Sequence, residues 1–255
     1  MSTGIGNEWV HVPWGPGVRV VQAHPCGLAA LEKPAGVLAH PNQPADRARS
    51  LLAAAYDEEA QVFSWVGADG RAERLWLLHR LDSATSGVVL VARVAQVAEA
   101  VRAAFEARTV HKRYVAVVFG HAREKQALWR DALSVQREEG AVRVLARGGA
   151  PAECRMRCLR ALPGPPALSL LQLEPLTGRT HQLRVQCAAR HLPILGDQTY
   201  GDFRRNREWA RRLGSDRLFL HAAAVKLEFV AGGQQVGFAA EVPLPAAFAP
   251  FSDGR

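Results

Sequence analysis

Residues 77–91 read LLHRLDSATSGVVLV. Two apolar runs, typical of buried strands, flank the polar segment HRLDSATSG. Ser and Gly suit a turn, but a turn needs neither the charged pair Arg80 and Asp82 nor the neighbouring His79. Asp82 falls where a strand ends and a turn begins, so its side chain can project from a rigid backbone. It is therefore either a reactive carboxylate or a turn residue paired with Arg80.

The rest of the chain predicts more strands than helices. Residues 94–108 carry apolar residues at helical spacing, and residues 221–243 have the pattern of a β-hairpin. Further helices are expected at 47–56, 179–191 and 201–214. The strands arrive as hairpins rather than in regular alternation with helices, which favours an α+β fold around a central, mixed but mostly antiparallel sheet.

The composition is that of a globular protein with an anionic partner. Of its 255 residues, 48% are hydrophobic and 22% charged, and the net charge is +8. The excess of arginine favours nucleic acid as a partner, although an arginine-rich genome would produce the same bias. The sequence has no secretory signal and no apolar run near the roughly 20 residues of a membrane span, so a cytoplasmic protein is expected.

No pattern indicates a metal or an organic cofactor. The four cysteines (Cys26, Cys154, Cys158 and Cys187) are dispersed and lack zinc-ligand spacing. They are interpreted as small buried apolar residues. Neither a GxGxxG nor a Walker pattern occurs, so we expect no cofactor.

Four other segments could carry chemistry, and each also has a structural interpretation. In LEPLTGRTHQLRVQ (173–186) a predicted helix begins at Arg179, Thr180 and His181, where backbone N–H groups could bind an anion. It could equally be a Thr-capped helix with solvent-facing arginines. Tyr114 heads the strand HKRYVAVVFG (111–120), which is usually a core position. EKPAGVLAHP (32–41) could be two turns, and HLPILGDQTYGD (191–202) could serve packing alone.

Taken together and in this order, the segments resemble the RluA-type family of RNA pseudouridine synthases. HRLDSATSG is similar to the signature HRLDxxTSG, KRYVAVV to the family's Tyr-bearing strand, and GRTHQLRVQ to GRTHQLRVH. EKPAGVLAHP, PILGDQTYG and LFLHAAAVKLEF also match in register. The resemblance covers residues 18–248, the expected catalytic domain, with an N-terminal arm at 1–17 and a C-terminal tail at 249–255. It implies an α/β domain with a cleft across a long sheet, without the S4-like module of many relatives.

The resemblance implies that uridine is isomerised to pseudouridine in structured RNA, either rRNA or a tRNA stem-loop. It implies Asp82 as the nucleophile, Arg184 as the cation that keeps the carboxylate ionised, and Tyr114 as the residue that stacks on the base. Arg80 would fill the vacated base stack or clamp a phosphate. The other expected RNA contacts are His79, Arg179, Thr180, His181, Arg204 and Arg205.

Two alternatives remain open, and one position departs from the family pattern. The chain could be a non-catalytic RNA-binding protein on the same fold, or a glycosidase, although no second carboxylate lies in a matching motif. Gln186 stands where the family has His, and an effect on packing or on an RNA contact is expected. Relatives commonly act as monomers, so a monomer is expected.

Overall fold

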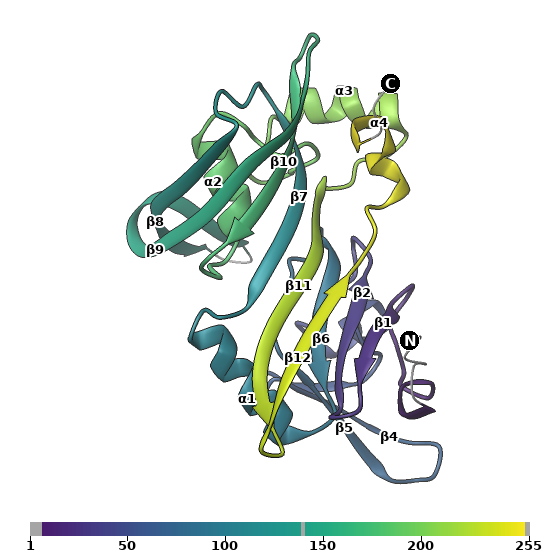
Figure 1. Cartoon of the computed structure of the whole chain (residues 1–255). Coiled ribbons are helices and arrows are strands. Elements are labelled where there is room, and N and C mark those ends of the chain that lie inside the picture. Colours follow the sequence, from purple (N-terminus) through teal and green to yellow (C-terminus); the bar gives the residue numbers. More distant parts are fainter. Residues whose placement is uncertain (1–6, 139–140, 253–255) are drawn as a thin grey trace. The chain divides into compact units, whose positions relative to one another are not determined.

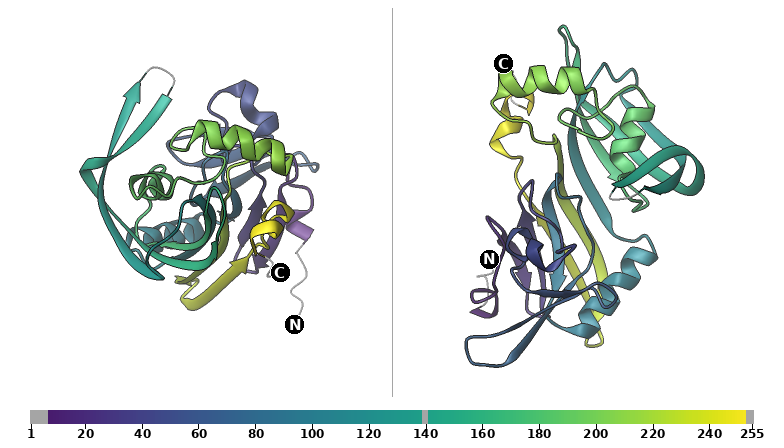
Figure 2. Two further views of the ribbon diagram at one scale, coloured as in Figure 1. Left: turned by 90° about the horizontal axis from the view of Figure 1, so that it is seen from above. Right: turned by 180° about the vertical axis from the view of Figure 1, so that it is seen from behind.

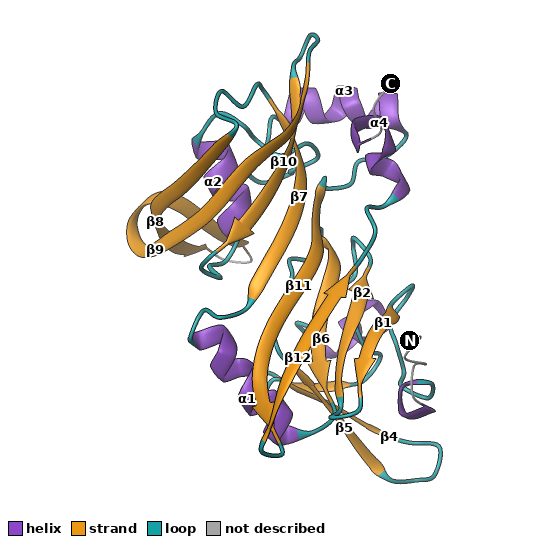
Figure 3. Ribbon diagram, viewed as in Figure 1, coloured by secondary structure: helices purple, strands orange, loops and turns teal. Residues whose placement is uncertain are grey.

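Strands dominate the regular structure of this chain (Figure 3). The computed structural model describes residues 7–138 and 141–252. The predicted α+β fold with a mostly antiparallel sheet is confirmed, since the pairs β1–β2, β2–β6, β4–β5, β11–β12, β7–β10, β10–β9 and β9–β8 are antiparallel. The chain divides into two compact units, one of residues up to 111 with 224–242, the other of residues 112–223 with those from 243 onward.

The first unit carries the segment HRLDSATSG between two strands (Figure 1). Its strand order is β3-β4-β5-β6-β11, β2 pairs with both β1 and β6, and β12 pairs with β11. Helix α1 contacts β5 and β6, and its apolar face joins the buried core of this unit. Its elements are β1 (Arg19–His24), β2 (Leu28–Lys33), β3 (Ala55–Asp57), β4 (Val62–Val66), β5 (Ala72–Leu77), β6 (Ser86–Ala92), α1 (Ala95–Glu106) and β12 (Gln234–Glu241).

The second unit has the strand order β11-β7-β10-β9-β8, and β11 (Leu220–Ala231) begins in this unit and ends in the first. Helix α2 packs against β8 and β9 (Figure 2), where Val185 meets Leu133, Val144 and Ala152. Its other elements are β7 (His111–Phe119), β8 (Gln126–Glu138), β9 (Ala141–Leu162), β10 (Leu168–Pro175), α2 (Gln182–Ala189), α3 (Phe203–Leu213) and α4 (Ala249–Ser252).

One predicted helix is wrong and another is shorter than expected. Residues 47–56 do not form a helix: a 3₁₀ turn covers Pro44–Arg49, and Ala55–Asp57 form β3, which pairs with β4. Alanine-rich runs suit a helix locally, but sheet pairing decides here. The helix expected at 179–191 begins only at Gln182 and ends at Ala189. The helix at 94–108, the basic helix at 201–214 and the hairpin at 221–243 are confirmed as α1, α3 and β11–β12.

Both ends of the described chain are packed. In the expected N-terminal arm, Trp9 and Val12 are buried, and the Trp14 indole donates to the Trp9 carbonyl at 3.1 Å. Trp9 and Val12 of this arm are therefore packed against the rest of the chain. In the expected tail, Phe251 of α4 is buried against Phe219. The domain boundaries at 17/18 and 248/249 stay predictions, as does the cleft. None of the described helices has the length and apolarity that crossing a membrane requires.

Candidate active site

Asp82 lies in the turn between β5 and β6, where it is half-buried. The amide of Thr85 donates to the Asp82 carbonyl at 3.0 Å and closes the turn. Thr85 and Ser86 are buried, and Gly87 has φ of 119°, a backbone conformation that favours glycine. The TSG part of the motif therefore shapes the turn that presents Asp82, as the sequence predicted.

A buried lysine fixes this turn. The Lys33 side chain is fully buried at the end of β2, and its Nζ donates to the carbonyls of Val37 (2.7 Å), Pro34 (2.9 Å) and Ser83 (3.0 Å). The Gly36 amide donates to the same Ser83 carbonyl at 2.8 Å. A buried ammonium is tolerated because it is fully hydrogen-bonded. The segment 32–41, interpreted as two turns, therefore holds the residue next to Asp82.

His79 and Arg80, which are expected to contact RNA, both have partners within the first unit. His79 accepts a hydrogen bond from the Leu90 amide at 3.1 Å and packs against Phe105. Arg80 is exposed, and its Nη1 lies 2.8 Å from Nε2 of His40. Within the described residues, Arg80 forms no ion pair with a carboxylate, so it is not a surface partner of Asp82.

Tyr114 lies near the start of β7 in the second unit, opposite Leu173 of β10, and is half-buried. Lys112, two residues earlier, points to the same face of the strand. Its Nζ lies 3.4 Å from the Thr177 carbonyl, and burial lowers the pKa of the Lys112 ammonium. Tyr114 therefore stands on a rigid central strand beside a partly desolvated cation.

The segment before α2 differs from the expected helix start. Arg179 and Thr180 are exposed and precede the helix, while His181 is the N-cap residue with φ of 52°. The Arg179 amide donates to the side-chain oxygen of Gln182 at 3.1 Å, so this buried glutamine holds the backbone just before the start of α2. Neither a Thr180 cap nor a helix N-terminus at Arg179 exists, because the left-handed His181 interrupts the helical path.

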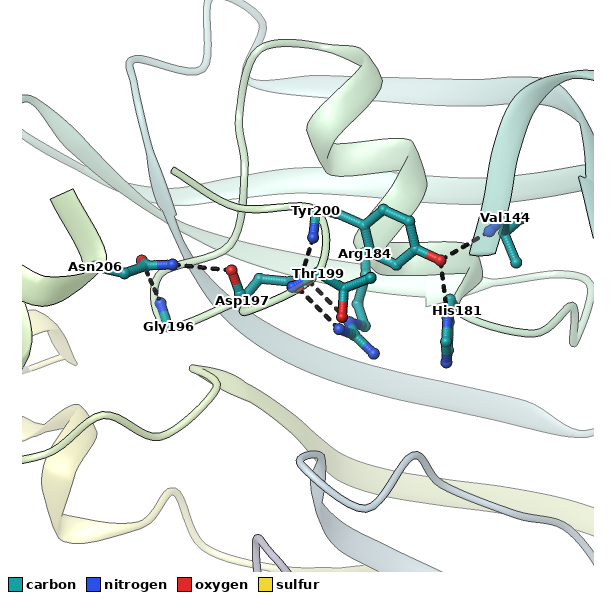
Figure 4. A network of polar contacts seen from close by, with 8 residues as sticks. All are labelled: Val144, His181, Arg184, Gly196, Asp197, Thr199, Tyr200 and Asn206. Atoms are coloured by element: carbon teal, nitrogen blue, oxygen red, sulfur yellow. Dashed lines mark hydrogen bonds and ion pairs between the residues drawn. The ribbon is translucent and has the colours of Figure 1, made fainter. Parts of the chain in front are cut away.

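Arg184 is the central cation of the second unit, and its partner is Asp197 (Figure 4). Nε of Arg184 donates to Oδ2 of Asp197, and Nη2 donates to Oδ1, each at 2.8 Å. Both side chains are buried, with 8% and 1% of their area exposed. Oδ1 also accepts from the amides of Thr199 (2.8 Å) and Tyr200 (3.0 Å). The carboxylate thus receives four hydrogen bonds in a region closed to water.

The environment of Asp197 determines its ionisation. Burial alone raises the pKa of this carboxyl, but the hydrogen bonds and charge of Arg184, with the Tyr200 and Thr199 amides, outweigh it. The pKa of Asp197 therefore lies below its usual value. Asn206 of α3 supports the turn around it, accepting from the Gly196 amide and donating to the Asp197 carbonyl, each at 2.9 Å. Arg184 is consequently held by a permanent anion on a rigid turn.

Tyr200 connects this pair to His181 and to the long hairpin. The Arg184 guanidinium lies over the Tyr200 ring, 5.2 Å from its centroid. The Tyr200 hydroxyl accepts from the Val144 amide of β9 at 2.9 Å and is hydrogen-bonded to Nδ1 of His181 at 2.8 Å (Figure 4). The segment 191–202, interpreted as packing, thus supplies two partners of the predicted site. Because a buried arginine needs a carboxylate partner, an aspartate in this segment was the sequence signal that could have identified Asp197 as the partner of Arg184.

Gln186 is fully buried and serves packing. Its Nε2 donates to Asp131 (2.7 Å) and to the Ala152 carbonyl (3.2 Å), and its Oε1 accepts from Gln182 (3.1 Å). A histidine has only two ring nitrogens and could not make all three bonds. Of the two effects expected for this departure from the family pattern, the structure supports the packing effect.

Arg204 and Arg205 begin helix α3. Asp202 caps the helix, and its side chain accepts from the amides of Arg204 (3.1 Å) and Arg205 (3.0 Å). Arg205 also pairs with Asp202 at 3.3 Å and lies over the Phe119 ring. The Arg204 side chain is exposed. The helix thus offers a basic outer surface.

Three further features concern metal binding, a buried thiol and a surface groove. Within 7–138 and 141–252, no three His, Cys, Asp or Glu side chains are grouped to hold a metal. Cys154 is buried, which raises its pKa to about 12, so the thiol is unreactive. An open groove of about 500 Å³ on β8, β9 and β10 contains none of the predicted site residues, being lined by Gln126, Ala127, Leu128, Arg155, Met156, Arg157, Gln172 and Glu174.

Comparison with known proteins identifies the class. The profile described as RNA pseudouridylate synthase matches residues 27–189, which contain Asp82, Tyr114 and Arg184. The human RNA Pseudouridylate Synthase Domain Containing 1 superposes with a TM-score of 0.64 at 26% identity, covering 90% of this chain and 87% of that one. The chain belongs to the RNA pseudouridylate synthase family, of the RluA type.

Individual relatives differ in length and in name. Ribosomal large subunit pseudouridine synthase C of Vibrio parahaemolyticus is 38% identical over 62% of this chain and 49% of its own length. The tRNA pseudouridine synthase C of Yersinia pestis is 33% identical over 81% of this chain and 80% of its own. The chain thus spans about half the length of some curated relatives and most of the length of others.

Proposed function

We propose that this chain is an RNA pseudouridine synthase that isomerises uridine to pseudouridine in structured RNA. In this reaction the C1′–N1 bond of uridine breaks, the uracil turns, and a C1′–C5 bond forms; C5 loses a proton and N1 gains one. No group enters or leaves overall, so the reaction needs no co-substrate. The observation that carries the proposal is the family match over residues 27–189, with HRLDSATSG inside it.

Asp82 is the proposed nucleophile. The Lys33-anchored turn supports this role, because a nucleophile must keep its position while the base moves. Arg184 is the proposed cation that keeps the nucleophile ionised, since a guanidinium does not deprotonate. The bidentate Asp197 contact uses Nε and Nη2 of Arg184 and fixes the plane of the guanidinium. Tyr114 is proposed to stack on the target base.

The proposed substrate is structured RNA, either rRNA or a tRNA stem-loop. Relatives are named for ribosomal RNA or for tRNA, and the tRNA pseudouridine synthase C of Yersinia pestis aligns over most of both chains. The target uridine must leave its stack, at a cost of a few kcal/mol. We propose that Arg80 fills the opened stack or clamps the flanking phosphate, with further RNA contacts from His79, Arg179, Thr180, His181, Arg204 and Arg205. The net charge of +8 supports binding to a polyanion.

Pseudouridine mapping tests the proposal. Total RNA from a strain lacking the gene is compared with RNA from its parent and from the deletion strain complemented with wild type or Asp82→Asn. We expect at least one pseudouridine to disappear, to return with the wild type and to stay absent with Asp82→Asn. Full restoration by Asp82→Asn would instead support the non-catalytic RNA-binding alternative.

We further propose that the protein acts as a monomer in the cytoplasm, where tRNA and rRNA are found. Light scattering behind size exclusion should give the 27.7 kDa of the chain. A mass of twice this value would contradict the monomer.

A further inference from the structure

Arg80 has an unusual partner for an arginine beside a candidate nucleophile. Its guanidinium is exposed and is hydrogen-bonded to His40, whose Nε2 lies 2.8 Å from Nη1. His40 comes from the segment 32–41, forty residues away in the chain and next to the turn that Lys33 anchors. The cation is therefore oriented without a carboxylate.

The hydrogen bonds of His40 define its tautomer. An arginine can only donate, so Nε2 must carry a lone pair. Nδ1 lies 3.2 Å from the Pro41 carbonyl, which can only accept, so Nδ1 must carry the proton. These two contacts together require a neutral imidazole. Arg80 consequently keeps its full positive charge while one of its N–H groups is held.

An aromatic stack fixes the imidazole. The His40 ring lies on the Tyr56 ring with centroids 4.8 Å apart and planes 17° apart. Tyr56 in turn packs on Phe63, its direct cross-strand partner, at 4.7 Å. Phe63 is fully buried. The chain of contacts from the core to His40 leaves its ring little freedom to rotate, so Nε2 is a fixed acceptor.

We propose that His40, seated on Tyr56, is a positioning residue that orients the Arg80 guanidinium toward an RNA phosphate beside the target uridine. The proposal rests on the proposed function for the presence of RNA. A carboxylate would also orient Arg80, but it would neutralise the charge and compete with the phosphate for the same N–H groups. A neutral acceptor orients the side chain, and the charge stays available. The rotamer entropy of a long exposed arginine is then largely lost before RNA arrives.

The test is a double-mutant cycle on RNA affinity. His40→Phe keeps an aromatic ring on Tyr56 and removes the acceptor, and His40→Gln restores an acceptor. Bulk tRNA from the strain lacking the gene is the probe, and binding is measured at several salt concentrations. We expect His40→Phe to weaken binding about 3- to 10-fold, the effect of one hydrogen bond, and His40→Gln to recover most of it.

The coupling to Arg80 separates positioning from a general structural effect. Arg80→Ala should weaken binding at least as much as His40→Phe and reduce the salt slope by about 0.7–0.9, one phosphate contact. His40→Phe should cause no further loss once Arg80 is removed. His24→Phe is the matched control: His24 also accepts through its ring, from the Cys26 amide at 3.2 Å, and its loss should leave affinity unchanged.

Each contrary result has a definite meaning. Additive losses in the cycle, or an unchanged salt slope in Arg80→Ala, would overturn the inference. Conversion of uridine is measured on the same proteins. A wild type that converts uridine without coupling between His40 and Arg80 would overturn this inference alone. A wild type that shows the coupling but converts no uridine would contradict the proposed activity alone, and one that binds no RNA would overturn both.

Discussion

Replacing Asp197 with asparagine should strongly destabilise the second unit. The two side chains have the same shape, but an asparagine NH2 in the place of Oδ2 would face the Nε–H of Arg184. The substitution therefore replaces at least one of the four hydrogen bonds on this side chain by a donor–donor contact. It also removes the charge of the carboxylate that the buried Arg184 guanidinium, 8% exposed, pairs with. The substitution therefore tests whether this ion pair contributes as much to the free energy of unfolding as its burial implies.

The expected magnitude follows from the burial of both partners. Removing one partner of a buried, hydrogen-bonded pair costs about 3–5 kcal/mol. At about 2–4 °C per kcal/mol for a chain of this size, Tm should fall by roughly 6–20 °C. Asp69→Asn is the control, because Asp69 pairs with Arg71 at 3.6 Å on the surface, with side chains 55% and 84% exposed. Its loss should cost less than about 1 kcal/mol.

Urea unfolding at neutral pH, followed by tryptophan fluorescence and circular dichroism, measures the effect. If Asp197→Asn changed the free energy of unfolding no more than Asp69→Asn, the argument from burial would be refuted. Adding Arg184→Met to Asp197→Asn should recover part of the stability, because no uncompensated charge then remains. A further loss in the double variant would show that Arg184 stabilises the fold without Asp197.

Two further predictions concern the buried charges of Lys33 and Asp197. Lys33→Met removes the donor to three carbonyls and should lower the free energy of unfolding by about 3 kcal/mol or more; hydrogen exchange at the Thr85 amide should quicken, and unchanged exchange would contradict the anchoring role. Because the pKa of Asp197 is lowered on folding, its stabilising effect is complete above the ordinary value of 3.8 and is lost as pH falls further. The stability difference between wild type and Asp197→Asn should therefore be constant near neutral pH and shrink below about pH 4, and a difference independent of pH would contradict the assignment.

The sequence alone was sufficient for elements with a strong local pattern. Helix α1 was predicted at 94–108 and lies at Ala95–Glu106, because its apolar spacing reflects the helix period and one buried face. The helix expected at 47–56 was wrong, because pairing between Tyr56 and Phe63 outweighs local helix preference. The start of α2 was misplaced, since the left-handed conformation of His181 has no signature in a non-glycine residue.

For the candidate site, too, some features could be predicted from the sequence and others only from the tertiary structure. The motifs of the sequence determined the family and the predicted roles of Asp82, Tyr114 and Arg184. Only the tertiary structure decided that Asp197 holds Arg184 and that His40 holds Arg80.

The physical reason is the range of each interaction. Strand and helix periodicity repeats every few residues, so it can be recognised in the sequence. A hydrogen-bond partner is whichever group the fold brings within about 3 Å, and here the partners lie 13 and 40 residues away with no repeating pattern. The neutral acceptor beside Arg80 and the buried anion beside Arg184 are therefore properties of the folded chain.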